Sequence, residues 1–134
     1  MKEQMKNRHI IAILAGVAML AGCQESLSEK CARECRLYTQ KNCPAQIDNH
    51  TILDSMTFEA ESNTIHYYYT LTGVADSVGL LTRETVRNAL KEQIRNTTML
   101  QAYKEEGYNF AYTYHSQRRP QLVLIDETMT PKDY

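Results

Sequence analysis

Residues 64–72 read Thr-Ile-His-Tyr-Tyr-Tyr-Thr-Leu-Thr, an almost unbroken run of β-branched and aromatic side chains. Such side chains pack well on a pleated surface, so the run predicts a β-strand. Alternation along that strand places Tyr67 and Tyr69 on one face and Tyr68 on the other. An earlier segment, 51–60, also alternates apolar and polar side chains and is separated from this strand by three turn residues. The short separation predicts a hairpin.

Two further segments have helical patterns. The first, 28–40, begins at Ser28, a residue type that caps helix N-termini. The second begins at Thr82, bends near 96–98 where weak helix formers cluster, and ends before Gly107. Its apolar residues recur every four positions and predict a face turned to the core: Val86, Leu90 and Ile94.

Two more strands are predicted near the end of the chain, at 108–115 and 121–127. The resulting element order is α-β-β-α-β-β. We therefore expect an α+β fold in which an N-terminal helix precedes a β-β-α-β-β unit. In this fold one amphipathic helix packs on a four-stranded antiparallel sheet.

The N-terminus has the layout of a secretory signal, with a basic start, an apolar run at 10–21 and small residues at its end. The apolar run is about a dozen residues, short of the roughly 20 that span a bilayer. It ends in Leu20-Ala21-Gly22-Cys23, which resembles the lipobox of bacterial lipoproteins. The resemblance implies cleavage before Cys23 and acylation of that residue with a diacylglycerol thioether and an amide-linked, palmitate-type chain.

The lipobox also implies a division of the chain. Residues 1–22 are the expected signal peptide, 23–27 a lipidated tether and 28–134 a single small domain. Gln24 stands where an inner-membrane retention signal has aspartate, so the expected location is the cell envelope, with an outer-membrane lipid anchor. The segment 82–134 also loosely resembles small bacterial envelope lipoproteins, and this resemblance implies no activity.

Three cysteines remain after acylation, Cys31, Cys35 and Cys43, in a compartment where disulfides persist. Cys31 and Cys35 are one helical turn apart, with Cβ atoms farther apart than a disulfide allows. The turn signal at Pro44 brings the chain back toward the helix. We therefore predict a Cys35–Cys43 disulfide and leave open the other pairings. Oxidation of exported thiols argues against a zinc site of these cysteines with His50.

Two candidate binding surfaces follow from the pattern. The predicted second helix carries a row of cations that could meet an acidic partner, or could simply be a solvated face: Arg83, Arg87, Lys91 and Arg95. The tyrosine-rich strands could present a binding face that includes Tyr68, or could serve only cross-strand packing.

The composition excludes some classes of function. The net charge of −1 argues against a nucleic-acid partner, and removal of the basic N-terminus makes the mature chain more acidic. We find no phosphate loop, nucleophile elbow or metalloprotease helix, and we expect no cofactor and no metal. The sequence thus favours a membrane-anchored, non-enzymatic module that binds an envelope protein, such as an assembly factor, inhibitor or immunity-type protein. The alternative is a small envelope enzyme with an unrecognised active site.

Overall fold

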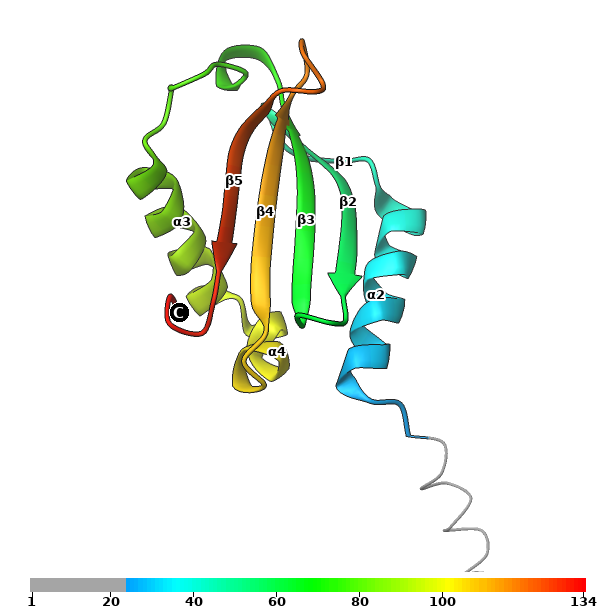
Figure 1. Cartoon of the computed structure of the whole chain (residues 1–134). Helices are drawn as coiled ribbons and strands as arrows, with labels where there is room; N and C mark the ends of the chain where they lie inside the picture. Colours follow the sequence, from blue (N-terminus) through cyan, green and yellow to red (C-terminus); the bar gives the residue numbers. More distant parts are fainter. Residues whose placement is uncertain (1–23) are drawn as a thin grey trace, which may run out of the picture.

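The computed structural model describes residues 24–134, so the predicted signal peptide and Cys23 lie outside the described residues. Figure 1 shows a sheet with α2 beside β2 at one side and α3 beside β5 at the other. The helices are α2 (Leu27–Asn42), α3 (Arg83–Asn96) and α4 (Gln101–Glu105), with short 3-10 helices η1 (Gly73–Ala75) and η2 (Thr98–Leu100). The strands are β1 (Ala45–Asp48), β2 (Thr51–Glu59), β3 (Thr64–Leu71), β4 (Asn109–Ser116) and β5 (Val123–Met129).

The α+β class is confirmed, but the expected four-stranded antiparallel sheet is wrong. The sheet has five strands in the order β1-β2-β3-β4-β5, and β3 pairs with β4 in parallel. Both expected hairpins form, β2 with β3 and β4 with β5. The segment between them crosses over the sheet as α3 and α4 and returns to the starting end. As a result β4 runs in the same direction as β3, as in other crossover connections.

Two further elements differ from the sequence-based expectation. Residues 45–48, expected as a connector, form β1 and pair antiparallel with β2. The single amphipathic helix is divided, because α3 ends at Asn96 and the chain passes through η2 before α4 begins. This break falls at the weak helix formers that predicted a bend.

The helix ends follow local chemistry. Thr82 caps α3 as predicted, since its hydroxyl accepts a hydrogen bond from the Thr85 amide at 3.2 Å. The cap of α2 is Ser26, not Ser28, because the Ser26 hydroxyl is the one that accepts from the Glu29 amide at 3.1 Å. Gly107 follows α4 with φ of +72°, a left-handed conformation that favours glycine.

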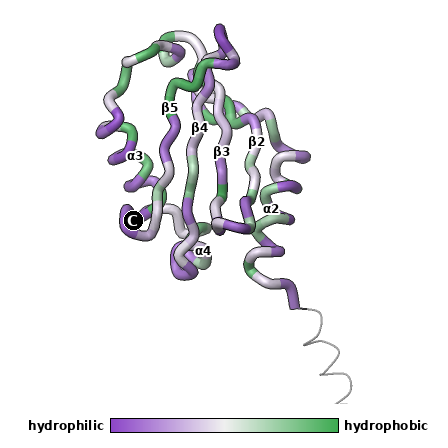
Figure 2. The backbone as a smooth tube through the Cα atoms, viewed as in Figure 1, coloured by the Kyte–Doolittle hydropathy of each residue, from purple (hydrophilic) through white to green (hydrophobic). Residues whose placement is uncertain are grey.

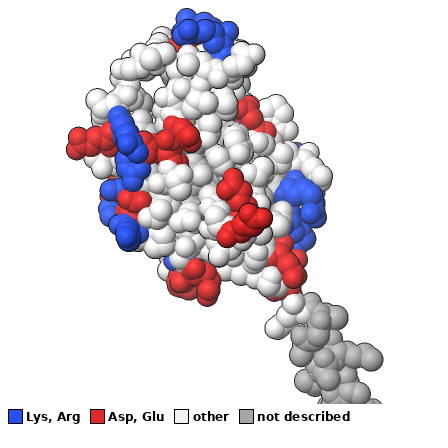
Figure 3. All heavy atoms as spheres, in the orientation of Figure 1, with Lys and Arg blue, Asp and Glu red and all other residues white. Residues whose placement is uncertain are grey.

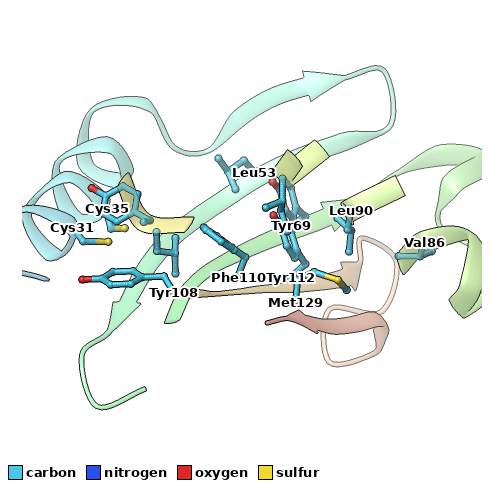
Figure 4. Packing of buried hydrophobic residues seen from close by; sticks show 13 residues of the cluster. Cys31, Cys35, Leu53, Tyr69, Val86, Leu90, Tyr108, Phe110, Tyr112 and Met129 are labelled. Atoms are coloured by element: carbon cyan, nitrogen blue, oxygen red, sulfur yellow. The ribbon is translucent and has the colours of Figure 1, made fainter. Parts of the chain in front are cut away.

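All three helices pack on one face of the sheet, which we call the covered face. Figure 4 shows its side chains meeting between the layers, with Phe110 and Tyr112 from β4 and Met129 from β5 at the centre. The predicted α3 stripe of Val86, Leu90 and Ile94 is buried against them. The opposite face, which carries Tyr68, has no helix on it among residues 24–134, and we call it the open face.

None of the helices within residues 24–134 combines the length and the apolar character that a membrane span requires.

Candidate functional site

Stacked tyrosines form the floor of the covered face. Tyr67 stacks on Tyr112 with ring centroids 5.1 Å apart, and Tyr69 stacks on Tyr114 at 4.6 Å. These pairs join the two parallel central strands, so they serve the sheet packing that aromatic cross-strand pairs provide. Burial raises the pKa of Tyr114 to about 12 and that of Tyr112 further, so both hydroxyls stay neutral at physiological pH.

A first groove, the loop groove, lies over this floor between α3, the segment 73–81 and the end of β1. Its volume is about 620 Å³, within the range of sites that hold a ligand. The α3 wall supplies Val86, Ala89 and Leu90, and the sheet supplies Tyr114 and Ile125. Most of the lining is apolar, so the groove suits an apolar occupant.

The loop 73–81 leaves large aliphatic side chains in solvent, and two of them, Leu80 and Leu81, line the rim of this groove. Figure 2 shows hydrophobic stretches along this loop, which arches from the end of β3 to α3 at the opposite end of the sheet from the start of α2. The side chains are between 56% and 72% exposed: Val74, Val78, Leu80 and Leu81. A cluster of this kind is typical of an interaction surface rather than of scattered surface hydrophobics.

A buried carboxylate holds the base of the loop. Asp76 accepts hydrogen bonds from the Arg118 backbone amide at 3.0 Å and from Arg118 Nε at 3.3 Å. The hydrogen bond from Ser116 and those from Arg118 keep the pKa of Asp76 below its usual range, so the carboxylate stays charged. The exposed aliphatic side chains are thus presented by a loop that is fixed to the β4–β5 turn.

A second groove, the interhelix groove, lies between α2 and the segment from η2 to α4. Its volume is about 530 Å³, and Tyr67 and Tyr112 form its floor. The thioether side chains of Met56 and Met99 also line it. Gln93 borders both grooves, so the two adjoin along α3.

The three cysteines within the described residues are free thiols. Cys31 and Cys35 are both buried on the α2 wall of the interhelix groove, and Figure 4 shows their sulfur atoms on the same side of α2. The hydrogen bond with Cys35 and burial raise the pKa of Cys31, so that thiol stays protonated. The Cys35–Cys43 bond is not formed in this structure, and the pairing stays a prediction.

The predicted cation row on α3 faces β5 and the C-terminal residues. Arg83 and Arg87 bind the buried carboxylate of Glu127 at 2.5 and 2.6 Å. Arg87 also binds Asp133 at 3.0 Å, as Lys91 does at 3.9 Å. Burial alone would raise the pKa of Glu127, but its hydrogen bonds to the two arginines outweigh burial and lower it. A role of the row in binding an outside partner stays a prediction.

Arg95 ends the cation row and pairs with Glu92 at 3.1 Å on the surface of α3. Figure 3 shows basic side chains over α3 at one margin, over α2 at the other and at the β4–β5 turn. None of the four cations of the row lines the loop groove or the interhelix groove. Arg83 and Arg87 therefore fix α3 to β5, and the groove side of the helix carries no cation of the row.

The open face carries a chain of polar groups that includes Tyr68. The Thr113 hydroxyl donates to Asp126 at 3.2 Å, so the contact of 2.8 Å between Thr113 and His66 uses Nε2–H as the donor. The other ring nitrogen, His66 Nδ1, lies 3.1 Å from the Tyr68 hydroxyl and 3.3 Å from Glu59 Oε1. The chain of polar groups therefore joins β3, β4 and β5 across the open face.

The structure does not bring the predicted candidate residues into one site. Tyr68 lies on the open face, the α3 cations lie toward β5, and Cys35 lines the interhelix groove. Among residues 24–134, no three His, Cys, Asp or Glu side chains are arranged to hold a metal ion. The sequence predicted a loop from Gly73 to Gly79 but no binding role for it, although Leu80 and Leu81 directly after Gly79 were a visible signal.

Comparison with known proteins assigns the fold to a family. Residues 26–125 match the model of the family described as Domain of unknown function (DUF8479). The chain belongs to this family. No curated protein sequence matches it significantly.

Solved structures resemble this DUF8479 domain in fold at low sequence identity. A protein of Pseudomonas aeruginosa described as secreted has a TM-score of 0.63 at 13% identity, covering 82% of this chain and 98% of its own. The type 2 secretion system pilotin EpsS of Vibrio vulnificus has a TM-score of 0.60 at 10% identity, covering 78% and 87%. The type II secretion system pilotin AspS of Vibrio cholerae has a TM-score of 0.60 at 13% identity, covering 86% and 98%. The DUF8479 domain shares its fold with these proteins.

Proposed function

We propose that this protein is a non-enzymatic binding module of the bacterial cell envelope that takes an apolar segment of a protein partner in the loop groove. The observation that carries the proposal is the juxtaposition of an apolar groove with a fixed rim of exposed aliphatic side chains. Binding of an apolar segment would bury these side chains, and this burial drives association.

The anchor belongs to the same proposal. Acylation of Cys23 holds the protein at the outer membrane by its N-terminus, and the tether 23–27 joins the anchor to the domain 28–134. Since the loop 73–81 lies at the opposite end of the sheet from the start of α2, the anchored molecule presents its groove rim away from the lipid. The shared fold with pilotins, which by name belong to a secretion system, supports a role as an accessory protein.

The test compares two charge substitutions at equally exposed aliphatic positions. Leu80→Asp together with Leu81→Asp places carboxylates on the groove rim. Ile47→Asp is the matched control, since Ile47 is 53% exposed and lies outside both grooves. Each variant is isolated from chemically cross-linked cell envelopes, and co-isolated proteins are quantified by mass spectrometry.

We expect one partner whose yield falls about tenfold with the rim variant and is unchanged with the control, because a desolvated carboxylate opposes apolar burial. Equal recovery from both variants would place the partner site elsewhere. Turnover of an envelope substrate by the purified domain would favour the enzyme instead.

A further inference from the structure

The interhelix groove lies next to the place where the chain leaves the described structure. Leu27 is the first residue of α2, and Cys31, which lines the groove, is four residues later, a rise of about 6 Å along the helix. Four residue steps separate Cys23 from Leu27, and even fully extended they reach about 14 Å. A group attached to Cys23 is therefore held within reach of this groove.

The groove has the chemistry of a hydrocarbon site. Most of its surface is apolar and comes from aromatic rings, thiols, thioethers and aliphatic side chains, with Lys41, Asn42, Gln93 and Thr97 as neutral or basic polar lining residues. Met99 at its mouth is 87% exposed. Unbranched thioether side chains adapt to irregular apolar shapes. Its one acidic lining residue, Glu34, already accepts the Tyr103 hydroxyl at 2.9 Å and pairs with Lys30 at 3.8 Å.

The length and number of the acyl chains on a lipidated Cys23 indicate which group can occupy the interhelix groove. One leaflet of the hydrocarbon core is about 15 Å thick, half of roughly 30 Å, so an acyl chain has the reach to pass from the tether into the groove. Two buried chains suffice for stable anchoring, which leaves the third chain of a triacylated cysteine free for another site. Covalent attachment raises its effective concentration at the groove to about the millimolar range.

We propose that the interhelix groove binds the amide-linked acyl chain of the protein's own Cys23. The inference rests on the acylation in the proposed function. The two diacylglycerol chains hold the membrane, and the third chain folds back along α2 against Tyr67 and Met99. The bound chain holds the domain close to the lipid surface and keeps the loop groove, on the other side of Gln93, clear for the protein partner.

The first experiment measures hydrocarbon binding by residues 24–134, which contain every described element of the fold. Titration with the fluorescent fatty acid cis-parinaric acid should saturate at one equivalent. Met99→Glu and Tyr38→Asp, both at exposed positions of the groove, should each weaken binding about tenfold, because a carboxylate there is desolvated by the bound chain. Thr57→Glu, on an exposed open-face position, is the matched control and should bind as the unmodified domain does.

The second experiment identifies the source of the chain in the full-length protein in its own membrane. A diazirine amino acid at position 99 is photoactivated in cells, and adducts are identified by mass spectrometry. The expected adduct joins position 99 to the acylated Cys23 peptide of the same molecule. An adduct to free phospholipid alone, or no lipid adduct at position 99, would overturn the inference.

The same samples separate this inference from the proposed function. If Cys23 is acylated and a partner cross-links at the loop groove, but position 99 captures no acyl chain, the inference fails and the proposed function stands. If the mass of the N-terminal peptide shows an unmodified Cys23, the anchor itself is wrong and the inference fails with it.

Discussion

The two faces of the sheet use the same strands but are held together by different forces. On the covered face, Phe110, Tyr112 and Met129 exclude water and pack with the helices. On the open face, His66 and Thr113 join strands through directed hydrogen bonds that are only partly buried. The comparison indicates that the covered face supplies most of the stability. It also holds the accessible apolar grooves, because the helices leave part of this face uncovered.

The largest expected effect comes from the centre of the covered face. Phe110→Ala should lower the free energy of unfolding by about 3–5 kcal/mol, since Phe110 is fully buried and its removal leaves a cavity. Thr128→Ala changes an exposed position paired with Ala111 on the open face and should cost under about 0.5 kcal/mol. Urea unfolding measures both, and similar losses would contradict the contrast between the faces.

A smaller effect is expected where α3 is fixed to the covered face by charge. Glu127→Gln should cost about 1–3 kcal/mol at pH 7, because Arg83 and Arg87 lose their buried carboxylate partner. The pKa of Glu127 is lowered in the folded state. The stabilisation that the Glu127 carboxylate gives the folded state is therefore complete above the unfolded pKa of about 4.3. It is lost as the pH falls through the lower pKa of the folded state. Urea unfolding from pH 7 to pH 2.5 should show the gap between Glu127→Gln and the unmodified protein narrowing, and a constant gap would refute the linkage.

The open-face network should matter less than the buried ion pairs. Thr113→Val keeps the side-chain shape but removes the hydroxyl between His66 and Asp126, and should cost about 1 kcal/mol. Chemical denaturation measures this loss in the free energy of unfolding. The imidazole ¹⁵N chemical shifts of His66 should also change, because its Nε2–H loses an acceptor, and unchanged shifts would mean that the network does not exist in solution.

The smallest expected effect is at the exposed end of the cation row. Arg95→Ala removes a surface pair with Glu92 and should change the unfolding free energy by less than about 0.5 kcal/mol. Arg87→Ala, at the half-buried position eight residues earlier, should cost more because it contacts both Glu127 and Asp133. Equal effects in thermal unfolding would show that the row acts only as a solvated surface.

Short-range sequence patterns predicted some elements of the fold. They did not predict the features that depend on contacts between distant residues. The strand at 64–71 and the apolar stripe of α3 were predictable because short-range periodicity follows burial. The parallel pairing of β3 with β4 was not, because it depends on where the crossover returns. Contacts such as Asp76 with Arg118, 42 residues apart, leave no local signal.

The sequence predicted some residues of the candidate site but not their arrangement in space. Tyrosines on one strand face were visible, and Tyr67 and Tyr69 do share the covered face. The grooves above them depend on how far the helices stand from the sheet, which side-chain packing decides. The fixed loop 73–81 depends on Asp76, whose partner lies in the distant β4–β5 turn.

Site-specific photo-cross-linking in cells tests the central claim, that the loop groove is the partner site, most directly. A photoreactive residue replaces Ala89 in the groove wall or Thr128 on the open face, both exposed positions. We expect position 89 to give one protein adduct that position 128 does not give, and expect the adduct to disappear when Leu80→Asp and Leu81→Asp are added. An adduct from position 128 alone, or one from position 89 that survives the rim substitutions, would contradict the claim.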